Sequence, residues 1–167
     1  GHVSRALILA LAPLPFDVIW IDPREGAFPS AVPSSVATIQ SENPAAEIAD
    51  APPGSFALVM THTHALHLEI IDAVLRSPSF AYAGLIGSAT KRARFSNRLR
   101  EAGVAENRIE ELVCPIGIPS IKSKHPSAIA AATAVQLLER DEVLRCAESP
   151  LADSLRLDKV GAGRRAS

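Results

Sequence analysis

Short apolar runs alternate with amphipathic stretches along most of this chain. Runs that are continuously apolar, or rich in β-branched and aromatic residues, predict strands at Phe16–Ile21, Val36–Gln40, Phe56–Met60 and Ala81–Ile86. A fifth, shorter strand is predicted within Ile109–Cys114, next to a short helix. Uninterrupted runs such as FALVM are typical of strands that are covered on both faces.

The stretches between the strands have helical spacing. Helices are predicted at His2–Leu11, at Pro44–Asp50, from about His64 to Leu75, from Gly87-Ser88 to a glycine cap at Gly103, and from Pro126 to about Leu138. This alternation predicts an α/β fold: a Rossmann-like parallel sheet of about five strands with helices on both faces. We expect the strands at Val18–Ile21, Phe56–Met60 and Ala81–Ile86 to be central, with only small helices beside Val36–Gln40.

Composition and charge restrict what the chain can be. Of its 167 residues, 47% are hydrophobic, which indicates one folded domain over residues 1–148 followed by a polar, flexible tail over 149–167. A net charge of -1 and 4% aromatic residues argue against a nucleic-acid partner. No run is long enough for a membrane span. The two cysteines suggest no disulfide scaffold, so we expect a cytoplasmic protein.

The start of the chain resembles part of a dinucleotide-binding motif. In a G-x-G-x-x-G pattern, Gly1 would be the second glycine, Ser4 would take the third position, and Asp22 would be the acidic residue about 20 positions on. On this interpretation we expect the first strand to be missing from the chain, which leaves an exposed edge that favours a homodimer. The plainer alternative is that Gly1 and His2 are foreign to the protein and that Asp22 forms a turn.

A glycine, a serine and a run of basic residues follow the predicted strand Ala81–Ile86. Backbone N–H groups at the start of a helix favour an anion. Gly87 permits close approach, Ser88 can cap the helix, and Lys91 and Arg92 follow within a turn. These residues predict a phosphate site. The alternative is a basic helix face that contacts only solvent.

Two other predicted strand ends carry polar or sulfur-containing residues. Thr61, His62 and His64 follow the strand Phe56–Met60, and contact with a polar ligand is favoured there over a metal site or a structural role. Cys114, Pro115 and Gly117 follow the last strand, where a tight bend is expected. Cys114 is either a soft ligand or a small buried hydrophobe.

These motifs together resemble a known family. The runs AYAGLIGSATKRARFSNRLREAGV and CPIGIPSIKSKHPSAIAAATAVQLL, with GHVSRAL, VIWIDPR and MTHTHALHLEII before them, are similar to the C-terminal Rossmann-like domain of XdhC/CoxI proteins. The resemblance extends from Gly1 to about Glu139. Two departures stand out: Ser4 replaces the usual glycine, and His67 stands where an acidic residue is common.

The resemblance implies an accessory protein rather than an enzyme. Such proteins bind molybdenum cofactor (molybdopterin) and support its sulfuration and insertion into xanthine dehydrogenase-type molybdenum hydroxylases, with a cysteine desulfurase as a further partner. The resemblance assigns cofactor contacts to the following residues: Gly1, His2, Ser4, Asp22, Thr61, His62, His64, Gly87, Ser88, Lys91, Arg92, Cys114, Pro115 and Gly117. It implies no catalytic residue and no metal ligand. An NAD(P)-binding oxidoreductase or nucleotide-binding domain is the alternative, based on the spacing from Gly1 to Asp22.

Overall fold

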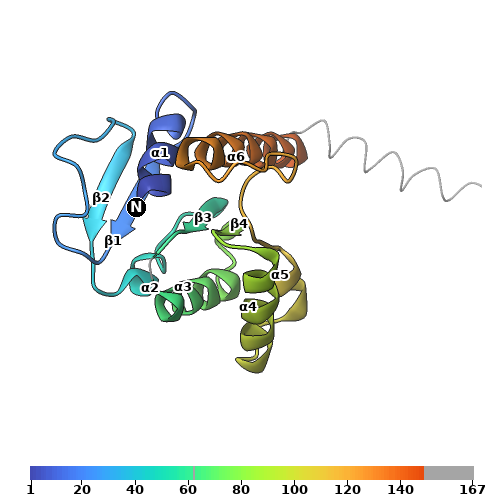
Figure 1. Ribbon diagram of the computed structural model, residues 1–167. Coiled ribbons are helices and arrows are strands. Elements are labelled where there is room, and N and C mark those ends of the chain that lie inside the picture. Colours follow the sequence, from blue (N-terminus) through green and yellow to red (C-terminus); the bar gives the residue numbers. More distant parts are fainter. Residues whose placement is uncertain (62, 149–167) are drawn as a thin grey trace, which may run out of the picture.

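The strands form two parallel sheets in the computed structural model, which describes residues 1–61 and 63–148 (Figure 1). β1 (Val18–Asp22) pairs with β2 (Val36–Gln40), and β4 (Phe80–Leu85) lies between β3 (Ser55–Val59) and β5 (Leu112–Val113). The α/β prediction is confirmed. The prediction of one continuous sheet was wrong, because β1 and β3 are not hydrogen-bonded to each other, so neither is central.

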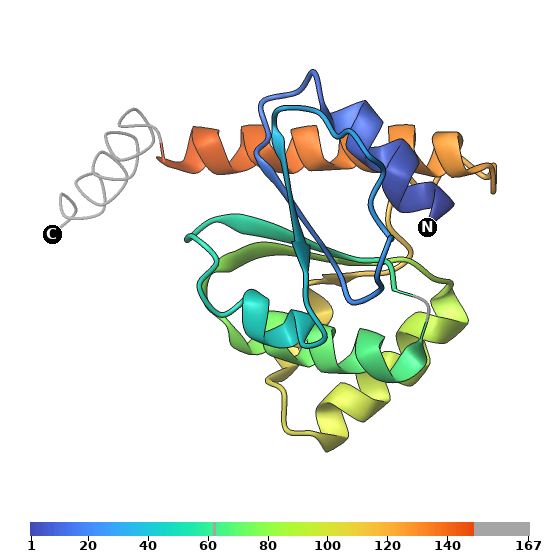
Figure 2. The same cartoon turned by 90° about the vertical axis from the view of Figure 1, so that its left-hand side faces the viewer.

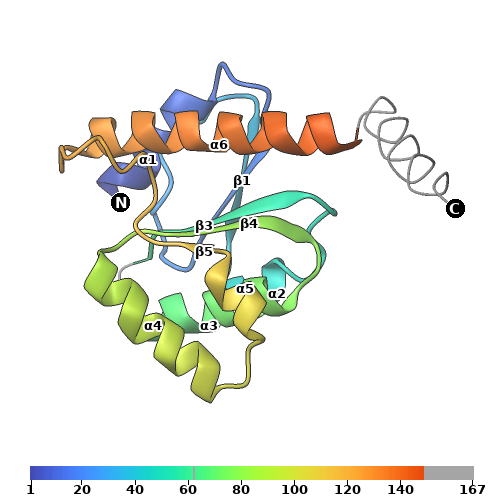
Figure 3. The ribbon, with the colours of Figure 1, turned by 90° about the vertical axis from the view of Figure 1, so that its right-hand side faces the viewer.

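Helices lie on both sides of the strands. They are α1 (His2–Leu11), α2 (Pro44–Glu47), α3 (His64–Arg76), α4 (Ala89–Glu101), α5 (Glu106–Glu110) and α6 (Pro126–Glu148). In Figure 2, α1 and α6 lie along one side, while α2, α3 and α4 lie along the other. Figure 3 shows α5 on the same side as α3 and α4. The helices therefore form two layers, one on each side of the sheet of β3, β4 and β5, while β1 and β2 run at a steep angle to those strands in Figures 2 and 3.

The residues of β3 alternate between two apolar cores. Ala57 and Val59 belong to the core that α3, α4 and α5 close, whereas Phe56 and Leu58 pack against the core that α1 and α6 close. This two-residue period is the expected geometry of a strand. It confirms that the continuously apolar run is covered on both faces.

The end of α4 has the cap that the sequence predicts. Gly103 has a positive φ of 79°, which glycine adopts without steric cost. The N–H of Val104 donates to the carbonyl of Leu99 at 3.0 Å, and the N–H of Gly103 donates to that of Arg100 at 3.0 Å. These two bonds form a Schellman motif. The chain leaves α4 in a fixed direction and enters α5.

Several predicted boundaries are shifted. β1 begins at Val18 instead of Phe16, and α2 ends at Glu47 instead of Asp50. The last helix continues to Glu148, well past Leu138, because its polar second half is helix-forming without being packed. No helix in 1–61 or 63–148 has the length and apolar character needed to cross a membrane. The predicted tail, 149–167, lies outside the described residues.

Candidate functional site

The carboxyl ends of β3, β4 and β5 meet at one edge of their sheet. Val59 is in register with Leu85, and Gly84 with Val113. The N–H of Ile86 also donates to the carbonyl of Val59 at 3.1 Å, which extends the pairing past the end of β4. The residues just beyond these strands, Thr61, Gly87 and Cys114, therefore lie at the same edge. The parallel sheet predicted from the sequence makes this grouping possible.

The turn from β4 into α4 is built around Gly87 and Ser88. The Lys91 N–H donates to Ser88 Oγ at 3.2 Å, so the serine caps the helix. A Cβ added to Gly87 would stand 2.6 Å from Lys91 Cδ and 3.1 Å from Cys114 Sγ. A larger residue at this position would force the Lys91 side chain to shift away from the turn. This turn therefore has the form of a cradle around the start of the helix.

An open hollow of about 350 Å³ lies at this turn, lined by Gly87, Ser88, Thr90, Lys91 and Arg94. Its volume falls within the lower part of the range of small-molecule sites. Its lining combines two basic side chains with the start of a helix, where backbone N–H groups favour negative charge. Among the residues that the structure describes, the lining contains no carboxylate. The hollow can therefore accept an anion of phosphate size.

Lys91 is held in place by three neighbours. Its Nζ donates to the carbonyl oxygen of Ile86 at 2.9 Å and lies 3.2 Å from His67 Nδ1. The same nitrogen stands 5.4 Å from the centroid of the Phe95 ring, within the range of a cation–π contact. Burial lowers the pKa of the Lys91 ammonium, Cys114 partly offsets that effect, and Arg94 adds to it.

The basic residues that follow Lys91 have different neighbours. Arg92 Nε donates to the carbonyl of Leu112 at 3.1 Å, and its Nη2 donates to that of Glu110 at 3.2 Å. Its guanidinium thus ties α4 to the segment containing α5 and β5. Arg94, nearly two turns of helix from the Ser88 cap, lines the hollow. Sequence reasoning assigned the contact to Arg92 and missed Arg94, because a run of charges does not show which way each side chain turns.

Cys114 lies directly against the turn. It is 7% exposed, and its Sγ stands 3.7 Å from the carbonyl oxygen of Ser88, within the reach of a thiol hydrogen bond. Burial raises the pKa of this thiol, although Lys91 and Arg92 act in the opposite direction. The group is therefore positioned as a buried thiol that supports the turn. Pro115, which follows through a cis peptide bond, is exposed.

Gly117 contacts α6, on the side of the sheet opposite to α3 and α4. It has a φ of 93°, and its N–H donates to Gln136 Oε1 at 2.9 Å while its carbonyl accepts from Gln136 Nε2 at 3.1 Å. The hydroxyl of Tyr82 donates to the same Oε1 at 2.7 Å. These bonds dock the loop after β5 onto α6. The structure thus places Gly117 apart from the turn at Gly87.

The residues predicted from the start of the chain form a second group. Gly1 caps α1, His2 is exposed, and Ser4 is buried on the packed side of that helix. Asp22 ends β1, and Arg24 donates to its carboxylate through N, Nε and Nη2 at 3.1, 2.9 and 2.8 Å. These bonds hold the pKa of Asp22 below its usual range, against the effect of burial. This group belongs to the sheet of β1 and β2, not to that of β4.

The histidine-rich segment is described only in part. Thr61 Oγ1 donates to the carbonyl of Thr63 at 3.3 Å, and Thr63 caps α3 through the N–H of Leu66. His62 lies outside the described residues, and His64 begins α3 with a side chain that is not described. His67 is 4% exposed and is the member of the segment that contacts Lys91. Sequence reasoning missed this contact, which joins residues 24 positions apart.

Comparison with known proteins places this arrangement in a family. The family model described as the XdhC Rossmann domain matches residues 1–137. The chain belongs to the XdhC family. It is 34% identical over 142 residues to an Escherichia coli protein described as uncharacterized protein YqeB, and the match covers 83% of this chain and 26% of that protein. The chain thus corresponds to about a quarter of that relative.

A solved structure has the same fold as this XdhC-family chain. It is described as a xanthine dehydrogenase from Bacillus halodurans, and it superposes with a TM-score of 0.72 at 23% sequence identity. The superposition covers 90% of this chain and 43% of the solved chain. At this identity the likeness establishes the fold.

Proposed function

We propose that this XdhC-family domain binds molybdenum cofactor as an accessory protein for a xanthine dehydrogenase-type molybdenum hydroxylase. The observation that carries the proposal is the basic hollow at the start of α4, where Lys91 and Arg94 border the Gly87-Ser88 turn. Molybdopterin has a phosphate group, and a helix start beside basic side chains suits such a group. Family membership and the relative described as a xanthine dehydrogenase point to the same enzymes.

The residues of the turn fit a phosphate in three ways. Gly87 lets Lys91 and Cys114 pack closely against the turn, since a Cβ there would meet both. The serine cap fixes the first turn of a helix of 13 residues. Lys91 supplies a charged donor that is already ordered by Ile86 and His67. When bound, the cofactor would supply the molybdenum centre, and this domain's residues would hold its phosphate and exclude solvent from one side.

The proposal includes transfer of the cofactor to the hydroxylase. Sulfuration of the cofactor would involve a cysteine desulfurase, and insertion would involve the hydroxylase itself. The buried Cys114 thiol supports the turn and is not assigned a chemical step. The domain's role is then to hold its cargo by the phosphate until transfer.

The Lys91→Ala variant tests the proposal. Loss of a charge-assisted contact costs about 1.5–3 kcal/mol. We therefore expect a roughly tenfold to hundredfold weaker affinity for molybdenum cofactor, measured by fluorescence titration under anaerobic conditions. Arg98→Ala, which removes an exposed charge from the same helix, is the matched control and should change the affinity little.

Two outcomes contradict the proposal. Equal and small losses in the two variants would mean that the basic residues form only a solvated helix face. Binding of NAD(P)H together with no affinity for molybdenum cofactor would favour the dinucleotide-binding alternative. The titration should therefore be run with both ligands on the same protein preparation.

A further inference from the structure

The buried side chain of His67 contacts Lys91, one of the basic residues that line the hollow. His67 projects from α3, is 4% exposed, and has its Nδ1 at 3.2 Å from Lys91 Nζ on α4. Its ring centroid lies 6.2 Å from that of Phe95, the residue whose ring Lys91 also approaches. The lysine is therefore enclosed by α3, by its own helix and by the end of β4.

The chemistry of the contact fixes the state of the histidine. A lysine ammonium has three N–H donors and no acceptor. Nδ1 of His67 must then be the acceptor, so the ring is neutral and carries its proton on Nε2. The ammonium gives a second N–H to the carbonyl of Ile86 at 2.9 Å. One N–H remains for an anion in the hollow.

The two groups that accept from Lys91 leave its charge uncompensated. Ile86 offers a carbonyl and His67 a neutral ring nitrogen, so neither carries a negative charge. The other titratable groups that act on Lys91 are Arg94, from α4, and Cys114, from the end of β5. Within the part of the chain that the structure describes, no carboxylate forms an ion pair with Lys91. The ammonium is thus held in position by two neutral acceptors.

We propose that His67 is a positioning residue that holds Lys91 at the hollow through a neutral acceptor, so that the ammonium is ordered without being neutralised. This inference rests on the proposed function, because the anion that benefits is the phosphate of the cofactor. A carboxylate at position 67 would hold the lysine at least as firmly. It would also compete with the anion for the same charge.

Three variants of His67 separate positioning from simple packing. His67→Gln keeps a neutral acceptor, His67→Asp keeps an acceptor but adds a negative charge, and His67→Leu removes the acceptor. The probe is inorganic sulfate, which stays doubly charged over the working pH range, and affinity is measured by calorimetry near neutral pH. We expect His67→Gln to bind within about threefold of the wild type, and His67→Asp to bind at least about tenfold more weakly, a change of about 1.4 kcal/mol. His67→Leu should fall between them.

The pH profile supplies a readout that a packing role would not change. Protonation of the new carboxyl in His67→Asp restores a neutral partner for Lys91. Sulfate affinity of that variant should therefore rise, relative to His67→Gln, as the pH falls through the titration of the carboxyl. Circular dichroism and the midpoint of thermal unfolding, measured for each variant, identify any that fail to fold. The comparison between His67→Gln and His67→Asp, made on variants shown to be folded, stands even if His67→Leu is unstable.

The outcomes distinguish this inference from the proposed function. If Lys91→Ala loses sulfate binding while His67→Asp binds as well as His67→Gln, the role of His67 is overturned and the anion site stands. Equal losses in all three His67 variants would also overturn it, since they would indicate packing alone. If the wild type binds no sulfate, both the inference and the anion site are refuted. If sulfate binding follows the expected order but molybdenum cofactor does not bind, His67 keeps its role and the proposed cargo is wrong.

Discussion

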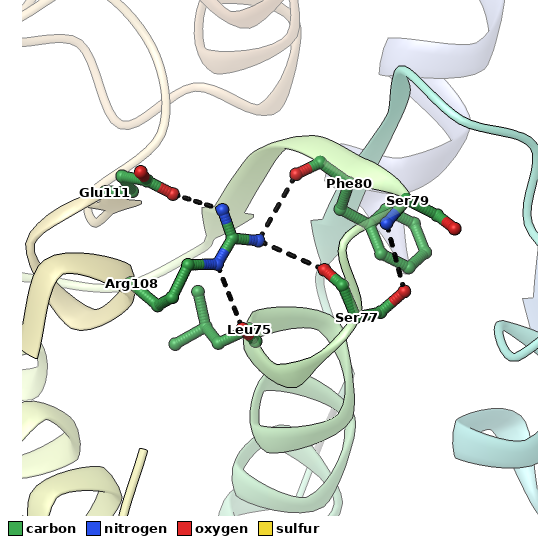
Figure 4. A network of polar contacts seen from close by, with 6 residues as sticks. All are labelled: Leu75, Ser77, Ser79, Phe80, Arg108 and Glu111. Atoms are coloured by element: carbon green, nitrogen blue, oxygen red, sulfur yellow. Dashed lines mark hydrogen bonds and ion pairs between the residues drawn. The ribbon is translucent and has the colours of Figure 1, made fainter. Parts of the chain in front are cut away.

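Replacement of Arg108 by alanine should lower the free energy of unfolding by more than is usual for a residue on a short, partly exposed helix. Figure 4 shows the guanidinium among backbone carbonyls at the junction of α3, β4 and α5. Nε donates to Leu75 at 3.0 Å, and Nη2 donates to Ser77 at 3.2 Å and to Phe80 at 3.3 Å, while Nη1 pairs with Glu111. Leu75 is in the last turn of α3, where carbonyls lack partners within the helix.

The size of the effect follows from these contacts. A hydrogen bond to a charged group contributes about 1.5–3 kcal/mol when its loss leaves the partner unsatisfied. The Arg108 side chain is 25% exposed, so water can reach some of the three carbonyls after the substitution. We therefore expect Arg108→Ala to lower the free energy of unfolding by about 2–4 kcal/mol, less than the sum of three separate bonds. Arg108→Lys should recover only part of this, because an ammonium cannot reach all three carbonyls.

The assay is urea unfolding followed by circular dichroism, with linear extrapolation to water. Arg100→Ala is the matched control. Arg100 also pairs with a glutamate, Glu106, but both side chains are about half exposed and no backbone carbonyl is involved. Its loss should be much smaller, because exposed ion pairs contribute little. If Arg108→Ala and Arg100→Ala destabilise the protein equally, the carbonyl contacts do not have the role assigned here.

Two further predictions concern buried groups that the chain makes easy to observe. Tyr82 is the one tyrosine of the sequence. Burial raises its pKa far above the usual value, despite the opposing effect of Arg140. Ultraviolet titration of the native protein should therefore show no phenolate near pH 10. Since the folded pKa is raised, the stability linked to Tyr82 is present below about pH 10 and is lost as the pH rises above it; a native titration near 10 would contradict this. Of the two cysteines, the exposed Cys146 should react quickly with a thiol reagent and the buried Cys114 slowly. If the remaining thiol of a Cys146→Ser variant reacts at the rate of the unfolded chain, Cys114 is not buried.

The sequence was sufficient for most of the fold because burial is encoded locally. The run Phe56–Met60 is apolar at every position, and its residues face two cores in alternation. The cap at Gly103 was also predictable, since few residues other than glycine adopt its φ of 79°. Strand pairing is different, because it depends on which runs meet in space. The separation of β1 and β2 from the other strands could not be obtained from the apolar pattern.

The site was predictable to the level of the strand ends, and no further. Parallel strands bring their carboxyl ends to one edge, which placed Gly87 and Cys114 together from sequence alone. Side-chain direction on α4 was not accessible, because Arg92 and Arg94 differ only by their rotation about the helix axis. The partner of Lys91 was missed for another reason. His67 looked like one of several histidines before a helix, and only its burial against α4 gives it a distinct role.

The two groups of strand-end residues differ in what a ligand would have to displace. A ribose bound in the usual dinucleotide manner donates its hydroxyls to the acidic residue at the end of the second strand. Here that residue, Asp22, is 13% exposed in its side chain and already accepts three hydrogen bonds from Arg24. A ribose would have to compete with the Arg24 guanidinium, a bidentate charged donor, for these carboxylate oxygens.

An anion at the start of α4 faces no such competition from Lys91. Its ammonium has one N–H left after Ile86 and His67, and the described residues that line the hollow include no carboxylate. Arg24 and Asp22 can remain paired while a phosphate binds at Gly87. The described geometry therefore favours a ligand anchored by one phosphate at β4 over a dinucleotide that also requires the carboxylate at β1. This difference is the physical reason for proposing molybdenum cofactor, and not NAD(P), as the ligand of the domain.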